Sequence, residues 1–234
     1  MNSVVLMLKS LGIHDLLHFD FMDPPPAEML IRALEQLYAL GALNDRGELT
    51  KLGRRMAEFP CDPQLSKAII LGDKYGCVAE CIIVGAMLNA GNAVYYRPKD
   101  RAVHADNARM NFARGGGGDH GALLRVYKQW ADADMSTQWC FENYIQAKSM
   151  VRARDVRDQF AGLCERVELE LSEASDVEAL SKAICGGYFY NAAKLASSGE
   201  YKTVKQMKTV YVHPSSVMAH EEVMPKWVCY HELA

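Results

Sequence analysis

Three groups of basic side chains stand out because each lies beside aromatic or polar residues that could share a ligand with it. In sequence order, the groups are Arg97, Lys99, Arg101 and Arg109; Lys148, Arg152, Arg154 and Arg157; and Lys194, Lys202, Lys205 and Lys208. Lysine and arginine neutralise backbone phosphates, and aromatic rings such as those of Tyr95 and Tyr96 stack on unpaired bases. From the residues alone, the pattern is equally compatible with a surface that contacts single-stranded nucleic acid and with an ordinary solvated face.

The second group is expected to lie on a helix, which limits how many of its members act together. Positions two apart on a helix point about 200° apart, so Arg152, Arg154 and Arg157 cannot all face one ligand. At most two of them are expected to bind nucleic acid. The alternative is an ordinary solvated face with internal ion pairs at helical contact spacing. These pairs would be Arg152 with Asp155 and Arg154 with Asp158.

The chain contains no sequence signature for catalysis of its own. It has no Gly-x-x-x-x-Gly-Lys-Ser/Thr phosphate loop and no Asp-Glu-Ala-His sequence, so ATP hydrolysis has no site in it. The glycine run 115–118 lacks the lysine and the preceding strand of a phosphate-binding loop. Cys77 and Cys81 lie one helical turn apart, but four ligands at zinc spacing are not present nearby. We therefore expect no catalytic residue, cofactor or metal in this chain.

Composition indicates a folded chain without a strong electrostatic bias. Half of its 234 residues are apolar, and 26 Lys and Arg against 29 Asp and Glu give a formal net charge of −3. A nucleic-acid site must then be a local basic patch. Seven cysteines without Cys-x-x-Cys spacing are typical of reduced, mostly buried thiols in a reducing compartment. No stretch has the apolar length of a membrane span and no secretion signal is present, so the protein is expected to be soluble and intracellular.

The run 37–63 gives the clearest structural signals. An amphipathic helix comes first, and a tight turn with the sequence Asn-Asp-Arg-Gly follows at 44–47. Thr50 is placed to cap the next helix, and Asp62 followed by proline is typical of a helix start. Residues 1–59 are therefore predicted to form a winged-helix domain, with a small wing on either side of the turn.

Residues 60–172 have the apolar periodicity of a helical bundle. The expected helices are one that ends near Gly76, a second over 82–88 that is apolar around most of its circumference, a third capped by Asp119, and a fourth from Ser136 or Thr137 to about Leu171. The connection 91–118 is long and has no predicted structure, which is typical of functional or mobile loops.

Residues 173–234 change character. Short β-like runs at 188–190, 203–204 and 210–212 are bounded by Gly199 and Pro214. They indicate the start of an oligonucleotide-binding barrel, which is expected to be incomplete here.

Ordered sequence motifs cover nearly the whole chain. In sequence order, they are Leu-Gly-Ala-Leu at 40–43, Leu-Thr-Lys-Leu-Gly at 49–53, Asp-Pro-Gln-Leu-Ser-Lys at 62–67, Tyr-Arg-Pro-Lys-Asp at 96–100, His-Ala-Asp-Asn-Ala-Arg at 104–109, Gly-Asp-His at 118–120, Gln-Trp-Cys at 138–140, Arg-Ala-Arg-Asp-Val-Arg at 152–157, Gly-Tyr-Phe-Tyr at 187–190 and Tyr-Lys-Thr-Val-Lys-Gln at 201–206. The chain resembles the C-terminal region of DEAH-box RNA helicases, and the later motifs are similar to the spliceosomal members that act before the first catalytic step.

The resemblance implies a mainly α fold: a winged helix at 1–59, a helical-bundle ratchet domain at 60–172 and a partial OB-fold at 173–234. In this family the ratchet and barrel enclose single-stranded RNA, and the ATP and magnesium sites lie in motor domains that this fragment lacks. The implied location is the nucleus, and the implied partners are pre-mRNA, spliceosome components and a G-patch activator protein. The helix after Pro26 and the segment 14–21 are the candidate docking sites for that activator.

The resemblance and the basic pattern together predict ten RNA-binding residues. They are Arg97, Lys99, Arg152, Arg154, Arg157, Lys202, Lys205, Gln206, His213 and Ser215. The last four of these match the family's barrel motif. The chain departs from the family pattern at Ala147-Lys148 and in the glycine run after Phe112. Two alternatives stay open: a ribosome-biogenesis or other nuclear DEAH-box helicase, and a non-enzymatic module whose winged helix grips a protein or DNA.

Overall fold

The structure is a computed structural model that describes residues 1–90 and 94–234. Within those ranges the helices are α1 (Asn2–Ser10), α2 (Ala27–Ala39), α3 (Lys51–Ala57), α4 (Pro63–Tyr75), α5 (Val78–Asn89), α6 (Ala102–Ala113), α7 (Gly118–Asp132), α8 (Thr137–Glu142), α9 (Ala147–Arg166) and α10 (Val177–Tyr188). Short 3-10 helices are η1 (Lys99–Arg101), η2 (Phe189–Asn191) and η3 (Val217–His220). The strands are β1 (Ala192–Leu195), β2 (Tyr201–Thr203), β3 (Thr209–Val210) and β4 (Trp227–Cys229). The predicted mainly α fold class is confirmed.

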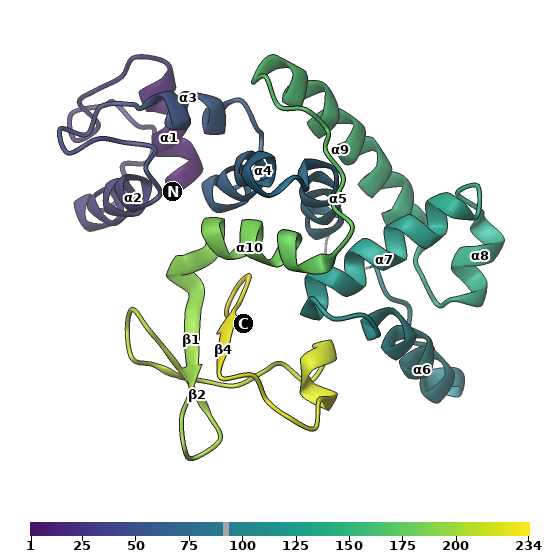
Figure 1. The fold of residues 1–234 in the computed structure, drawn as a ribbon. Coiled ribbons are helices and arrows are strands. Elements are labelled where there is room, and N and C mark those ends of the chain that lie inside the picture. The colour runs from purple at the N-terminus through teal and green to yellow at the C-terminus, as the bar shows by residue number, and fades with distance from the viewer. Residues whose placement is uncertain (91–93) are drawn as a thin grey trace.

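The strands form one antiparallel sheet in the order β3-β2-β1-β4. Figure 1 shows α4 and α5 in the middle of the molecule, with α9 on one side and α10 followed by the sheet on the other. The most extensive packing between helices agrees with this view, because α10 packs on α4 and α9 packs on α5. None of the described helices is both long and apolar enough to cross a membrane.

The winged-helix turn forms as its sequence predicts. Asn44 accepts hydrogen bonds from the backbone N–H groups of Arg46 (3.0 Å) and Glu48 (2.9 Å), and Gly47 takes the left-handed φ of 74° that the turn requires. The strand-like bridge on either side of this turn joins Leu43 to Leu49. These contacts confirm the small wing.

The predicted helix signals at 50–76 are also confirmed. The hydroxyl of Thr50 accepts the N–H of Gly53 at 3.0 Å, and the carboxylate of Asp62 accepts the N–H of Gln64 at 2.9 Å. Gly76 ends α4 with a φ of 67°. The next helix, α5, is buried almost continuously from Val78 to Met87, so its all-round apolar sequence does mark the centre of the bundle.

Two of the predicted helix boundaries in the bundle are wrong. Asp119 does not cap α7, which begins after Gly117 in a left-handed conformation; the Asp119 carboxylate instead accepts hydrogen bonds from Ser216 Oγ and from the N–H of Val217 (3.0 Å). The predicted long fourth helix is in fact two helices, α8 and α9. The helical conformation is interrupted between them at Tyr144, which has a φ of 57°. Ser136 does cap α8, through the N–H of Trp139 at 3.2 Å.

The connection 91–118 is not structureless. Its first part, 91–93, lies outside the described residues, but η1 and α6 occupy most of the remainder. Sequence periodicity misses α6 because only Ala105 and Phe112 are buried in it, so no apolar stripe is present. Arg125 on α7 fixes the end of this connection by donating to the carbonyls of Phe112 (2.6 Å) and Gly116 (2.7 Å).

The segment before the sheet is helical rather than β-like. Asp176 caps α10 through the N–H of Ala179 at 3.1 Å, and the helix buries Leu180, Ala183 and Ile184 at helical spacing. Tyr188, predicted to lie in a strand, is the last residue of this helix. The aromatic run at 188–190 has a high β-propensity, which is why the sequence predicted a strand there. The segment is helical instead because the apolar face of α10 is buried against α4.

Candidate nucleic-acid interface

A pocket of about 350 Å³ lies where the sheet region meets helix α2 of the winged helix. We call it the barrel pocket. Its lining residues are Gln36, Tyr190, Asn191, Thr203, Lys205, Gln206, Tyr230, Glu232 and Leu233. The set combines one cation, two phenol rings, three side-chain amides and a carboxylate, so it offers both a stacking face and hydrogen-bonding groups for a base edge.

Two of the lining residues, Lys205 and Tyr190, contact each other. The Lys205 ammonium nitrogen lies 3.7 Å from the centroid of the Tyr190 ring, which is the distance of a cation–π contact. Lys205 is exposed, so its charge remains accessible to a phosphate. The site therefore presents an aromatic ring and an accessible positive charge side by side.

The turn between β2 and β3 holds Lys205 and Gln206 in place. Thr203 accepts the N–H of Met207 on its carbonyl (2.9 Å) and the N–H of Lys208 on its hydroxyl (3.0 Å). Met207 takes a φ of 54°, a left-handed turn conformation. Short-range hydrogen bonds therefore position both predicted residues at the pocket.

The other predicted barrel residues are exposed on the same subdomain. Lys202 pairs in register with Lys194 across β1 and β2, which gives that sheet two adjacent cations. Ser215 and His213 are joined by a hydrogen bond of 2.7 Å between the hydroxyl and the Nδ1 atom, in the connection from β3 to η3. Neither Lys202 nor the His213–Ser215 pair lines the barrel pocket.

Arg97 and Lys99 lie in the segment that precedes α6. Arg97 donates two hydrogen bonds to the Asp106 carboxylate, at 2.7 and 2.9 Å, and this contact lowers the pKa of Asp106. A phosphate would have to compete with that carboxylate for the guanidinium group. Lys99 is exposed in η1. Asp106 therefore joins α6 to the segment that precedes it.

The arginines of α9 are paired differently from the sequence prediction. Arg154 pairs with Asp155 at 2.9 Å and Arg157 with Asp158 at 3.1 Å, each with its direct neighbour rather than one helical turn away. The long guanidinium side chains reach along the helix to these carboxylates. Arg152 is exposed. Figure 1 shows α9 on the far side of α4 and α5 from the sheet, so this group does not share a site with the barrel pocket.

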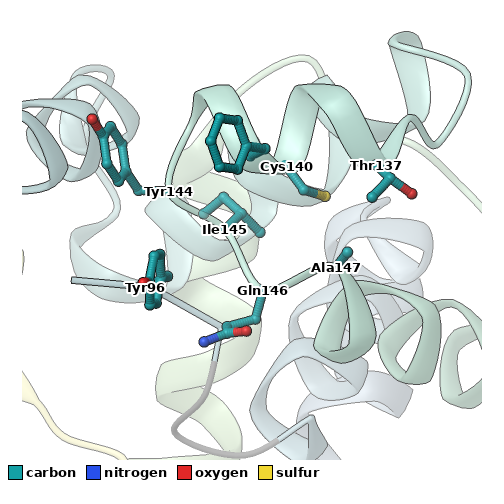
Figure 2. Close-up of a pocket in the computed structure, with 8 residues that line it drawn as sticks. Tyr96, Thr137, Cys140, Tyr144, Ile145, Gln146 and Ala147 are labelled. Carbon is teal, nitrogen blue, oxygen red and sulfur yellow. The ribbon is translucent and has the colours of Figure 1, made fainter. Parts of the chain in front are cut away.

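A second pocket, of about 230 Å³, lies between the 94–98 segment and the break between α8 and α9. Tyr96, Thr137, Cys140, Phe141, Tyr144, Ile145, Gln146 and Ala147 line it. Figure 2 shows Tyr96 and Tyr144 on one side of it and Thr137 and Ala147 on the other. Backbone hydrogen bonds of 2.8 Å, from Tyr96 N to Tyr144 O and from Gln146 N to Val94 O, fix the two walls. Its surface is mostly aliphatic and aromatic, unlike the barrel pocket.

Six pocket residues besides Tyr190 were not predicted as site residues. They are Gln36, Asn191, Thr203, Tyr230, Glu232 and Leu233. Tyr190 carried a usable signal, since it belongs to the aromatic run 188–190 that ends two residues before β1. The other pocket residues carried no sequence signal. They belong to segments that are far apart in the chain, such as α2, the β2–β3 turn and the residues after β4, and only the tertiary fold brings these segments together.

The C-terminal segment contacts the last residue of α10 through His231, and it lies close enough to His120 of α7 for the two imidazoles to repel each other. The rings of Tyr188 and His231 lie 5.4 Å apart, and His231 also faces His120. Burial, followed by the repulsion from His231, lowers the pKa of His120 to about 4, although the neighbouring Asp119 acts in the opposite direction. The folded protein therefore keeps this imidazole neutral at physiological pH.

We expect the stability of the protein to fall as pH drops from about 6.5 to about 4. Between these pH values His120 is protonated in the unfolded state but neutral in the folded state, so lowering the pH favours unfolding. Above pH 6.5 His120 is neutral in both states, and the protein keeps its full free energy of unfolding. The expected loss is about 2 kcal/mol after allowance for the partly exposed residue. Urea unfolding of His120→Gln between pH 4 and 7 should show a flatter pH dependence than the wild-type protein. A slope equal to that of wild type, or an equal flattening by the exposed His104→Gln control, would contradict this.

Comparison with known protein families gives three matches in order along the chain. Residues 33–61 match the helicase associated domain (HA2), winged-helix; residues 62–123 match the helicase associated domain (HA2), ratchet-like; and residues 180–234 match the oligonucleotide/oligosaccharide-binding (OB)-fold. Together these domains indicate the C-terminal region of a DEAH/RHA-type helicase. Helicases of that class are ATP-dependent enzymes, and the 234 residues contain no motor sequence of their own.

Proposed function

We propose that this chain is the C-terminal module of a nuclear DEAH-box RNA helicase that remodels the spliceosome during pre-mRNA splicing. Its role is to enclose single-stranded RNA beside motor domains that bind ATP and magnesium, and to receive a G-patch activator. The three domain matches support the helicase class. The splicing role rests on the resemblance of motifs such as Tyr-Arg-Pro-Lys-Asp at 96–100 and Tyr-Lys-Thr-Val-Lys-Gln at 201–206.

The observation that carries the RNA-binding proposal is the cation–π pair of Lys205 and Tyr190 in the barrel pocket, within the OB-fold match. A base that stacks on the tyrosine face and a phosphate that meets the ammonium group would use both residues at once. The paired arginines of α9 and the Arg97–Asp106 pair are weaker candidates, because each already has a carboxylate partner.

We expect Lys205→Glu to weaken the binding of single-stranded RNA roughly tenfold, since the variant replaces an attractive charge by a repulsive one at the pocket. Tyr190→Ala should cost about 1–3 kcal/mol of binding free energy by loss of stacking. Fluorescence anisotropy with labelled RNA oligonucleotides measures both.

Lys74→Glu is the matched control for this experiment. Lys74 also lies over a tyrosine ring, that of Tyr75, at 5.4 Å, but at the end of α4 remote from the sheet. Its replacement makes the same charge change and should leave RNA affinity nearly unchanged. Equal weakening by Lys205→Glu and Lys74→Glu would show that only net charge matters and would refute the pocket.

The winged helix supports the proposed docking of a G-patch helix. Ile31 and Tyr38 lie seven positions apart, so they share one face of α2, and they are 49% and 56% exposed. Leu17, in the segment before this helix, is 62% exposed. An amphipathic peptide helix buries such side chains in its target surface.

We expect Ile31→Asp to reduce the affinity for a G-patch peptide at least tenfold, because it places a charge in the proposed apolar contact. Isothermal titration calorimetry with the peptide provides the measurement. Val103→Asp, at an apolar position on α6 that is 70% exposed, is the control and should bind the peptide normally. Unchanged affinity of Ile31→Asp would exclude this face of α2 as the docking site.

A further inference from the structure

Two aromatic rings and two lysines from three separate segments are linked by direct contacts beside the barrel pocket. Phe189 and Tyr190 are neighbours in η2, and their ring centroids lie 5.5 Å apart with an angle of 67° between the ring planes. The ammonium nitrogen of Lys67 on α4 lies 5.4 Å from the centroid of Phe189, and that of Lys205 lies 3.7 Å from the centroid of Tyr190. Each ring therefore has a cation of its own. We call these four residues the lysine–aromatic row.

The row crosses the joint between two domains. Figure 1 shows α10 packed along α4, with β1 leading away from the end of α10, and η2 connects these last two elements. Lys67 lies within the ratchet-like match at 62–123, whereas the other three residues lie within the OB-fold match at 180–234. A ligand that occupied the whole row would contact both domains.

The two ammonium groups of the row have no anionic partner in the protein. Lys205 is exposed and Lys67 is half-buried, and neither forms an ion pair with a carboxylate of the described residues. Arg97, by contrast, is held by Asp106. Burial lowers the pKa of Lys67, because the charged form loses water around it. A phosphate oxygen beside this ammonium group would replace that water.

The two rings of the row are suited to unpaired bases. Phe189 is 38% exposed, although Tyr188 directly before it is only 2% exposed and packs in the core. An exposed aromatic ring offers a stacking face to a base of any sequence. Since the planes of Phe189 and Tyr190 meet at 67°, two bases that stack on them cannot stack on each other. The bases of a duplex stack continuously, so the row should select a single strand.

We propose that the lysine–aromatic row binds two successive nucleotides of a single-stranded RNA and leads the strand from the barrel pocket to helix α4. Each ring stacks one base and each ammonium group meets one phosphate. The inference rests on the proposed RNA-binding function and adds two residues to its site. They are Lys67 and Phe189, neither of which lines the barrel pocket.

The stacking half of the proposal is tested at Phe189 by fluorescence anisotropy, with the complete chain and a labelled single-stranded RNA. Phe189→Leu keeps an apolar side chain for packing but removes the ring, so affinity should fall about tenfold. Phe189→Tyr restores the ring and should recover most of the affinity. An iodouridine-containing RNA should cross-link under ultraviolet light to both Phe189 and Tyr190. Thermal unfolding of each variant shows that it is folded.

The charge half of the proposal is tested at Lys67. Lys67→Glu should weaken binding about tenfold and make the plot of log K against log salt concentration shallower by about one phosphate contact. Lys74→Glu is a close control, because Lys74 lies on the same helix and its nitrogen is also 5.4 Å from an aromatic centroid, that of Tyr75. It should change neither the affinity nor the slope.

Lys205→Glu separates failure of this inference from failure of the proposed function. Weak binding by Lys205→Glu together with normal binding by Phe189→Leu and Lys67→Glu would overturn the row and leave the barrel pocket in place. Normal binding by all three variants would overturn both. Wild-type affinity for Phe189→Leu, or a duplex RNA that competes as well as the single strand, would also contradict the row.

Discussion

Replacing Lys128 with methionine is expected to lower the free energy of unfolding by about 3 kcal/mol, because it leaves a buried carboxylate without its counter-ion. Glu80 on the central helix α5 is only 2% exposed, and it accepts hydrogen bonds from Lys128 Nζ at 3.0 Å and from the N–H of Ala174 at 3.3 Å. This carboxylate therefore joins α5, α7 and the segment that leads to α10. Urea-induced unfolding followed by circular dichroism measures the loss.

A double-mutant cycle separates the charge effect from lost packing. Glu80→Gln keeps the shape and a hydrogen-bonding group but removes the charge, so the pair Glu80→Gln with Lys128→Met should be clearly more stable than Lys128→Met alone. Lys182→Met is the matched control, since Lys182 pairs with Glu178 at 2.7 Å on the surface and its replacement should change stability little. A Lys128→Met protein as stable as Lys182→Met would contradict the role of the buried pair.

Replacing Gly187 with alanine is expected to destabilise the protein by about 2–3 kcal/mol, because the new methyl group has no room. A Cβ atom at Gly187 would lie 2.3 Å from the carbonyl oxygen of Gln64 and 2.9 Å from the Cβ of Ala68. Both contacts belong to α4, and one of them is backbone that cannot turn away. Helices α4 and α10 would have to separate, and the sheet that follows α10 would move with it.

Gly162→Ala gives the matched control for this helix. Gly162 also lies inside a helix, α9, but nothing lies within 4 Å of the position of its Cβ. Alanine should therefore stabilise that helix by about 0.5–1 kcal/mol through its higher helix propensity. Thermal unfolding of both variants should show opposite shifts. A Gly187→Ala protein that is as stable as wild type would show that α10 does not pack on α4 as closely as described.

Local signals predicted the parts of the fold that depend on a few neighbouring residues. Thr50, Asp62 and Gly76 act through hydrogen bonds or a left-handed turn within their own segment, so the sequence alone identifies them. The break at Tyr144 was missed, because only the surrounding fold stabilises a positive φ at a non-glycine residue beside otherwise helical sequence.

The candidate site could be predicted only in part. Lys205 and Gln206 were identified from their motif, but the ring beneath the ammonium group belongs to Tyr190, fifteen positions earlier. The partners of the α9 arginines depend on rotamers, which periodicity does not determine, and those pairs were predicted incorrectly. Contacts between remote segments, such as Gln36 of α2 with the barrel pocket, have no sequence signal.

The most direct test of the proposed RNA-binding role is the salt dependence of RNA affinity for several single-stranded RNAs of unrelated sequence. The account predicts similar affinities for all of them, and a linear fall of log K with log salt concentration, with a slope of about −0.7 for each phosphate contacted. Lys205→Glu should make that slope shallower by about one contact. Binding that is confined to one sequence, or that does not respond to salt, would contradict it.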